Sequence, residues 1–545
     1  MPRLTHAAVI PVAIAGLLLS ALPALATPFA PAPSPPDSYG RQRIDWHPCG
    51  DKEIPASAPP SADALRCGEY TAPRDWSHPL DGNDVTIAVS KLPASGTARG
   101  VIVTNPGGLG VPGRTFPIRF LDEKRVRANY DIIGFDPRGT GESSNITCGG
   151  ATSDVDPLDP RDHSGQNIDL ILDTTEAAAD VCRRKSGALG PYVNTYQTAH
   201  DIDLLRTLLH RDTISWIGYS AGTWLGAHYA TAFPSRVDKM VLDSNLEFTT
   251  DWQQAFDWQP LGFERRWRSD FLPWLARYHH LYGYGHTGEV ARLRYEKVRH
   301  ALRKKPIKLG GQTIGPNQFD LQISSALYDK AAFPVLGKYL RAVAKLTIGD
   351  ASGQRRRNAL DTLWRLRLRE NTGLPLPLPL AVGVGNGSAG APYAGEYEDA
   401  ADASFWTIPC NETEWTGDRH SVVEQSQDFG AKYPLLGWSW LVQPCVFWHN
   451  DDPVDLPTPT GVGVPPVLMV QSTHDPATPI EGARRAHANF EGSRMITVTG
   501  EGDHGIYAGG NRCVDKLVNA YLVDNLVPPD STCDGMPLPD PEPSP

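Results

Sequence analysis

Ser220 stands in a sequence context that could activate a nucleophile. The apolar run 214–217 predicts a buried strand, and Gly218, Ser220 and Gly222 follow with the spacing G-x-S-x-G before a helical pattern. On a sharp strand-to-helix turn, small flanking residues let the backbone close and expose the serine hydroxyl. The following helix would offer its first N–H groups and positive dipole end to a developing oxyanion. The alternative is a glycine-lined tight turn with a packing serine.

A serine nucleophile needs a base and an orienting acid, and two later loops offer both. Asp475 follows the apolar run 467–471, and His504 follows the run 495–498. The chain order serine, aspartate, histidine is that of the α/β-hydrolases. Asp243, at the end of the strand after the nucleophile, is the alternative acid. Asp475 could instead be a turn-forming residue before proline.

A glycine-rich loop after an earlier strand could complete an oxyanion hole. The run 101–104 leads into Asn105-Pro106-Gly107-Gly108-Leu109-Gly110. Glycines allow backbone N–H groups to approach a substrate carbonyl closely. We expect the Ala221 N–H to act with one N–H from Gly108 or Leu109. The alternative is a plain glycine-rich connector.

These loops need a parallel sheet to bring them together. Short runs rich in Val and Ile alternate with helical patterns, at 85–89, 100–104, 130–135, 214–217, 239–242, 466–471 and 494–498. Such alternation predicts an α/β fold with a mostly parallel sheet flanked by helices. The long interval between the run 239–242 and the run 466–471 is helical in pattern. It predicts a large, mainly helical cap domain inserted after the sixth strand.

The chain therefore divides into a leader, an interrupted core and an insert. Residues 1–26 read as a secretory signal peptide, because Arg3 precedes an apolar stretch that ends in Ala24-Leu25-Ala26. An uncleaved membrane anchor is the alternative. Further boundaries are 27–37 for a Pro-rich leader, 38–248 and 455–545 for the two parts of the core, and 249–454 for the cap.

Eight cysteines in an exported chain favour disulfides over metal or thiol chemistry. Eight cysteines allow 105 pairings, and proximity in sequence suggests Cys49–Cys67, Cys148–Cys182, Cys410–Cys445 and Cys513–Cys533. We find no zinc-type spacing of cysteine or histidine. We therefore expect neither a metal nor a cofactor.

The net charge and the distribution of apolar residues limit the kinds of partner that the protein could bind. The 51 basic and 62 acidic residues give a net charge of −11, which disfavours binding to nucleic acid through phosphates. No later stretch is apolar enough to span a membrane. We expect a secreted or periplasmic protein, monomeric and free of the membrane after signal cleavage.

Several motifs occur in one order that resembles a known family. They are Asn105 to Gly108, Phe135 to Ser143, the Ser220 turn, Ala232 to Pro234 with Val241 to Asp243, Asp475 to Pro479, and Gly505 after His504. Together they resemble the secreted tripeptidyl-aminopeptidase-like α/β-hydrolases, relatives of proline iminopeptidase. The resemblance implies Ser220 as nucleophile, Asp475 as acid and His504 as base. The residues around Gly107 and Ala221 depart from the family pattern, which leaves substrate preference open.

A peptidase that acts from the N-terminus must hold an α-ammonium group, for which a carboxylate in a pocket is the natural partner. The acidic half of the predicted cap offers Glu396, Glu398, Asp399, Asp402, Glu412 and Glu414. We select Glu412, because a disulfide at Cys410 would fix its backbone. The predicted substrates are peptides, and the predicted product is a tripeptide. Alternatives are a proline iminopeptidase, a carboxylesterase or amidase, and a non-catalytic secreted binding protein.

Overall fold

Ten strands form one sheet in the computed structural model, which describes residues 35–50, 53–55, 58–349, 352–370, 397–450 and 453–541. The strands are β1 (His47–Pro48), β2 (Arg66–Pro73), β3 (Asp84–Leu92), β4 (Gly100–Asn105), β5 (Tyr130–Phe135), β6 (Ile214–Tyr219), β7 (Val237–Asp243), β10 (Val467–Ser472), β11 (Ser493–Thr499) and β12 (Ser531–Asp534). The predicted signal peptide and most of the predicted leader lie outside the described residues.

The sheet is parallel through its centre and antiparallel at one edge. Its order is β1-β2-β3-β5-β4-β6-β7-β10-β11-β12, and the pairs from β5 to β12 are all parallel. Every residue of β6 and β10 is buried, as expected for strands covered on both faces. The predicted α/β-hydrolase sheet is therefore confirmed, and the carboxyl ends of β6, β10 and β11 lie at one edge.

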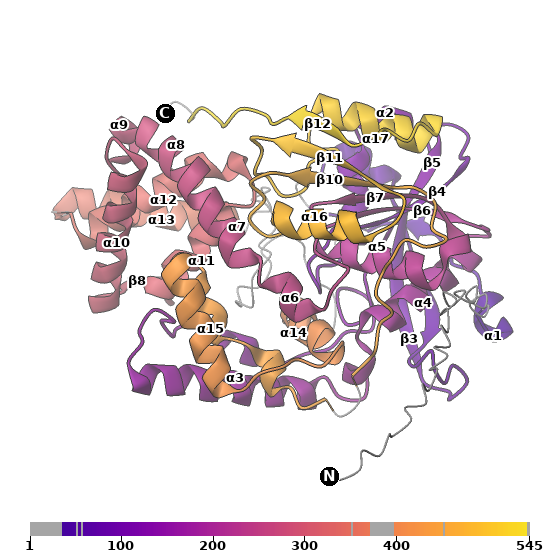
Figure 1. Cartoon of the computed structure of the whole chain (residues 1–545), viewed down its shortest axis with the longest axis horizontal. Helices are drawn as coiled ribbons and strands as arrows, with labels where there is room; N and C mark the ends of the chain where they lie inside the picture. The colour runs from indigo at the N-terminus through magenta and orange to yellow at the C-terminus, as the bar shows by residue number, and fades with distance from the viewer. Residues whose placement is uncertain are drawn as a thin grey trace, which may run out of the picture. The chain divides into compact units, whose positions relative to one another are not determined.

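Helices cover both faces of the sheet. The helices α2 (Lys124–Arg127) and α17 (Arg512–Asp524) contribute Val126, Val514 and Val518 to a cluster with strand residues on one face. On the other face lie α4 (Thr195–Leu208), α5 (Ala221–Ala232) and α16 (Ile480–Asn489) (Figure 1). The helix α5 is almost completely buried, so the turn that precedes it is held rigidly.

The interval between β7 and β10 holds the predicted helical insert, which follows the seventh strand of the chain and not the sixth as predicted. Its elements are α6 (Trp252–Phe256), α7 (Gln259–Arg265), α8 (Leu272–Arg277), α9 (His279–Tyr282), α10 (Gly288–Lys304), β8 (Ile307–Leu309), β9 (Gln312–Ile314), α11 (Pro316–Ala326), α12 (Phe333–Thr347), α13 (Gly353–Glu370), α14 (Ala400–Asn411) and α15 (Arg419–Lys432). Between α7 and α8 the chain takes a π-helical turn, Arg266–Phe271. Buried aromatic side chains, including Trp267, Phe271 and Trp274, form the core of this insert.

One long helix of the first core segment packs with the insert. The helix α3 (Gly165–Lys185) contacts α14 and the short turn Pro444–Phe447, and Arg419 of α15 forms ion pairs with its Asp173 and Glu176. Figure 1 shows α3 running beside α14 and α15. The insert and core thus interlock, and the predicted domain boundaries stay a prediction.

The described cysteines form the four predicted disulfides, Cys49–Cys67, Cys148–Cys182, Cys410–Cys445 and Cys513–Cys533. Among the described residues, no helix is both long enough and apolar enough to cross a bilayer. The additional strands β2 and β12 were not predicted, since β2 mixes charged residues with glycine and proline, and the short β12 has no branched apolar residue.

Candidate active site

Ser220 lies between β6 and α5 on a strained turn. Its φ of 54° and ψ of −123° are uncommon for a residue with a side chain, and such a conformation costs about 1–3 kcal/mol. The turn can close because residue 218 is glycine: a Cβ there would lie 2.2 Å from the Gly222 carbonyl oxygen. The Ser220 N–H donates to the Asp243 carbonyl oxygen at 2.9 Å. The predicted strand, turn and helix are therefore present.

His504 and Asp475 form a buried hydrogen-bonded pair. The His504 Nδ1 lies 2.9 Å and 3.0 Å from the two carboxylate oxygens of Asp475. The Asp475 side chain is fully buried, and its Oδ1 also accepts the N–H groups of Ala477 at 3.0 Å and Thr478 at 2.9 Å. These donors orient the carboxylate toward Nδ1 of His504, which leaves Nε2 on the opposite side of the ring as the atom that can act as a base.

The loop that carries His504 packs directly against the serine turn. A Cβ on Gly505 would lie 3.2 Å from the ring of Tyr219, which immediately precedes Ser220. The Gly505 N–H donates to the Ser244 Oγ at 2.8 Å. The His504 Nε2 is buried and makes no hydrogen bond with any residue that the structure describes. Serine and histidine thus come from adjacent loops, with the accepting nitrogen unoccupied.

Asp243, the alternative acid, has a different position. Its carboxylate accepts the N–H groups of Ile506, at 3.1 Å and 3.0 Å, and of Tyr507, at 2.7 Å. Burial raises the pKa of Asp243 to about 6, although those two N–H groups lower it. Asp243 therefore supports the backbone after His504, whereas Asp475 contacts the imidazole itself.

The glycine loop after β4 lies against the serine turn. Gly107 has a φ of 86°, and a Cβ on it would lie 2.6 Å from the Ser220 Cβ and 3.1 Å from the Ala221 nitrogen. Only glycine permits this approach. Gly108 and Leu109 follow directly in the chain, and they stay the predicted source of the second oxyanion donor. The arrangement suits two donors to an oxyanion.

Glu412 is enclosed rather than open. Its carboxylate is fully buried at the end of α14, where it accepts the Trp252 Nε1–H at 2.7 Å and the Thr195 N–H. Burial raises the pKa of Glu412 to about 7, although these donors lower it. Trp252 stacks on Trp224 of α5, with ring centroids 3.9 Å apart. Glu412 therefore supports the junction between the insert and the nucleophile helix.

Two further carboxyl groups near the insert have raised pKa values. Asp402 of α14 and Asp156 are partly buried and form no ion pair with any described residue. Burial, with the nearby Asp399, raises the pKa of Asp402 to about 6. Burial, with Asp402 and Asp154, raises that of Asp156 to about 8.

Asp156 also lines an apolar cavity. The other lining residues include Phe256, Phe405, Trp406, Trp415 and Trp440. Next to Asp402, the Ala401 carbonyl oxygen lies so close to Gly110 that a Cβ on Gly110 would be 2.4 Å from it. The helix α14 thus contacts the glycine loop that lies beside Ser220.

Two contacts of His504 were not predicted from sequence. The Thr478 Oγ1 lies 3.4 Å from Nδ1, and Tyr328 of the insert accepts the His504 N–H on its carbonyl oxygen at 2.8 Å. The Tyr328 ring meets the imidazole edge-on, with centroids 5.2 Å apart. Thr478 could have been found from the turn Asp475 to Thr478, whereas no local signal marks Tyr328.

Two family models match this chain. The model described as "alpha/beta hydrolase fold" matches residues 100–279, which include Ser220 and the glycine loop. The model described as "TAP-like protein" matches residues 433–533, which include Asp475 and His504. The matched segments therefore cover both halves of the site.

Curated relatives match over most of their length. A tripeptidyl aminopeptidase of Streptomyces lividans is 32% identical over 89% of this chain and 85% of its own. The serine protease Hip1 of Mycobacterium tuberculosis is 26% identical over 90% of each chain. A protein of the same organism named carboxylesterase B is 26% identical over 95% of this chain and 96% of its own.

Proposed function

Because this chain belongs to the tripeptidyl aminopeptidase family of α/β-hydrolases, we propose that it removes tripeptides from the free N-terminus of peptides as a secreted serine exopeptidase. The observation that carries the proposal is the pairing of His504 with Asp475 beside the strained Ser220 turn. A serine protease and a tripeptidyl aminopeptidase among the relatives support peptides as substrates. The relative named carboxylesterase B is 26% identical, as is Hip1, whereas the tripeptidyl aminopeptidase is 32% identical.

The proposed reaction is acyl transfer through a covalent intermediate. The His504 Nε2 takes the proton of Ser220 as its Oγ attacks the scissile carbonyl carbon. Asp475 stabilises the imidazolium, and the N–H of Ala221 with that of Gly108 or Leu109 binds the oxyanion. The imidazolium gives its proton to the leaving amine. Water then attacks the acyl-enzyme with His504 as base, which releases the acyl product and restores Ser220.

The free N-terminus of the substrate requires a negative partner. Glu412 remains the predicted partner, and its raised pKa of about 7 means that it is partly neutral near neutral pH. Asp402 is a second candidate, since it forms no ion pair with any described residue and its helix contacts the glycine loop. A bound ammonium would supply the missing positive charge. Replacement of the true partner raises KM for free peptides and leaves ester hydrolysis unchanged.

A matched set of anilides tests the proposal. Wild type and Ser220→Ala are assayed on a free tripeptidyl anilide, its N-acetyl form, a prolyl anilide and a simple p-nitrophenyl ester. We expect the free tripeptidyl anilide to react much faster than the acetylated one. Equal rates on both contradict the exopeptidase, and preference for the prolyl anilide supports a proline iminopeptidase. Ester hydrolysis alone supports an esterase, and activity that survives Ser220→Ala contradicts the site itself.

Export is part of the proposal. The disulfides and the secreted character of such disulfide-rich chains support an extracellular or periplasmic location. Signal cleavage after about Ala26 and action as a monomer remain predictions. Sequencing the N-terminus of protein secreted from an expressing cell tests the cleavage site directly.

A further inference from the structure

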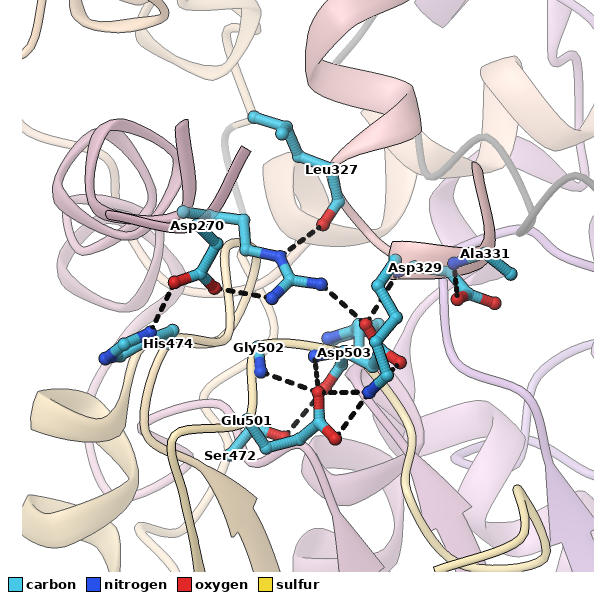
Figure 2. A network of polar contacts seen from close by, with 12 residues as sticks. Asp270, Leu327, Asp329, Ala331, Ser472, His474, Glu501, Gly502 and Asp503 are labelled. Atoms are coloured by element: carbon cyan, nitrogen blue, oxygen red, sulfur yellow. Dashed lines mark hydrogen bonds and ion pairs between the residues drawn. The ribbon is translucent and has the colours of Figure 1, made fainter. Parts of the chain in front are cut away.

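The acid and the base of the site are each preceded by a residue bound to the same turn of the insert. Asp503 precedes His504, and its Oδ1 accepts a hydrogen bond from Arg266 Nη2 at 2.6 Å. His474 precedes Asp475, and its Nδ1 lies 2.8 Å from Asp270 Oδ1. Figure 2 shows Asp270, His474, Glu501 and Asp503 gathered in one polar network. The shared anchor is the π-helical turn Arg266–Phe271, a form often found at functional positions.

Arg266 joins the two contacts. Its side chain is only 1% exposed, and its Nη1 donates to Asp270 Oδ2 at 2.5 Å. Its Nε donates to the Leu327 carbonyl oxygen at 3.2 Å. A Cβ on Gly502 would lie 2.1 Å from Nη1, so the loop before His504 fits closely against the guanidinium.

Lys330 and the nearby Tyr328 form a second attachment between the insert and the loop that carries His504. Lys330 Nζ donates to both oxygens of Glu501, at 2.7 Å and 2.6 Å, and lies 2.8 Å from Asp503 Oδ2. The Lys330 N–H donates to Asp503 Oδ1 at 2.7 Å. Two residues earlier, the Tyr328 carbonyl oxygen accepts the His504 N–H. One short segment of the insert thus contacts three of the four residues from Glu501 to His504.

The network is buried, so its charges depend on one another. Burial raises the pKa of Asp503 to about 6, while Arg266 and Lys330 lower it. Burial also opposes ionisation of Asp270, yet the contacts with His474 and Arg266 outweigh it and lower the pKa of Asp270. Removing one member of such a group leaves an uncompensated buried charge, which the loop relieves by moving.

The opposite side of the loop is fixed by the core. Asp243 accepts the N–H groups of Ile506 and Tyr507, and Arg119 donates to the carbonyl oxygens of Gly505 and Tyr507. His504 therefore lies between a core attachment on its C-terminal side and an insert attachment on its N-terminal side. If the insert attachment were lost, residues 501–504 would lose their charged partners, and the core attachment would not replace them.

We propose that Arg266, Asp270 and Lys330 are positioning residues, through which the insert sets the alignment of His504 and Asp475 with Ser220. The proposal rests on the proposed catalytic roles of Ser220, His504 and Asp475, but not on the proposed specificity for peptides. It makes the insert a structural part of the acid–base machinery as well as a cover. The insert cannot move at residues 327–330 without moving His504.

The test measures the second-order rate at which a fluorophosphonate acylates Ser220, with kcat and KM on a p-nitrophenyl ester. The variants are Arg266→Met, Arg266→Lys, Asp270→Asn and Lys330→Met in the full chain. Arg299→Met is the matched control, because Arg299 is also a buried arginine of the insert paired with two carboxylates, Asp320 and Asp159, away from the loops. Thermal unfolding is recorded for each protein.

We expect Arg266→Met to lower acylation and kcat by about 100-fold with KM nearly unchanged, since small misplacements of a catalytic group have this effect. Arg266→Lys restores part of the rate, Asp270→Asn and Lys330→Met lose less, and Arg299→Met loses stability but keeps its rate. Rates in folded Arg266→Met, Asp270→Asn and Lys330→Met equal to that of Arg299→Met overturn the proposal. If Arg266→Met does not fold, the two milder variants decide.

Failures of the two proposals are distinguishable. A wild-type protein that reacts with the fluorophosphonate but cleaves no peptide contradicts the exopeptidase and leaves the positioning test intact. A wild-type protein that is not labelled at Ser220 contradicts both.

Discussion

The nucleophile and the base of this site are positioned in different ways. Ser220 takes its geometry from close neighbours, namely the glycine at 218, the helix α5 and the end of β7. His504 depends on distant residues, with Tyr328 and Arg266 in the insert and Asp243 in the core. The serine turn is therefore held within the core alone, whereas the histidine loop is held by both the core and the insert.

The largest predicted effect on activity distinguishes Asp475 from Asp243, the two acids near His504. Asp475→Asn should lower kcat by about 10⁴-fold, because the imidazole would lose the carboxylate that orients it. Asp243→Asn should instead loosen the loop and cost about 1–3 kcal/mol in the free energy of unfolding, since two N–H groups lose their acceptor. Steady-state kinetics and urea unfolding measure both. Asp243→Asn with the larger loss of kcat would reverse the assignment of the acid.

A change on the nucleophile side should have an intermediate effect. Gly107→Ala places a Cβ 2.2 Å from the Tyr219 carbonyl oxygen. The serine turn or the glycine loop must move to relieve this contact, and the movement should lower kcat by about 100-fold. Gly82→Ala is the matched control, because Gly82 also has a positive φ, 79°, but no described residue other than its chain neighbours comes within 4 Å of its Cβ position. The control should lose only about 1–2 kcal/mol of stability and no activity. Equal activity of the two variants would show that the glycine loop does not support the serine turn.

The smallest effect concerns Glu412, where the insert meets the nucleophile helix. Its pKa is raised from 4.5 in an exposed state to about 7 by burial, so the folded protein favours the protonated form. This contribution to stability is complete below pH 4.5 and is lost as the pH rises to about 7. Urea unfolding of wild type and Glu412→Gln should show the difference between them changing across this range, to the disadvantage of wild type at the upper end. A constant difference contradicts the burial of an ionisable group.

The sequence predicted the parts of the fold that depend on local pattern. Val- and Ile-rich runs marked the central strands, and proximity predicted the disulfide pairs, because short loops between cysteines close easily. The strand β2 was missed, since Arg66–Pro73 mixes charged and turn-forming residues and is specified by its pairing with β3. Pairing across a sheet leaves little trace in a single strand.

Within the site, too, the sequence shows the features that depend on local pattern but not those that depend on packing between distant segments. Ser220, Asp475 and His504 follow strand ends, which a sequence displays. The contacts of Tyr328 and Arg266 with the histidine loop arise from packing between segments 176 and 237 residues apart, and no periodicity records them. Glu412 was chosen as a pocket carboxylate, yet its contacts with Trp252 and Thr195 could not be foreseen, because they depend on how α14 packs.

The most direct test of the proposed exopeptidase activity is the mass of the products released from an unblocked nonapeptide and from its N-acetyl form. We expect successive losses of tripeptides from the free N-terminus of the first peptide, slow or no cleavage of the second, and no reaction with Ser220→Ala. Cleavage at internal bonds, or equal cleavage of both peptides by the wild-type protein, would contradict it.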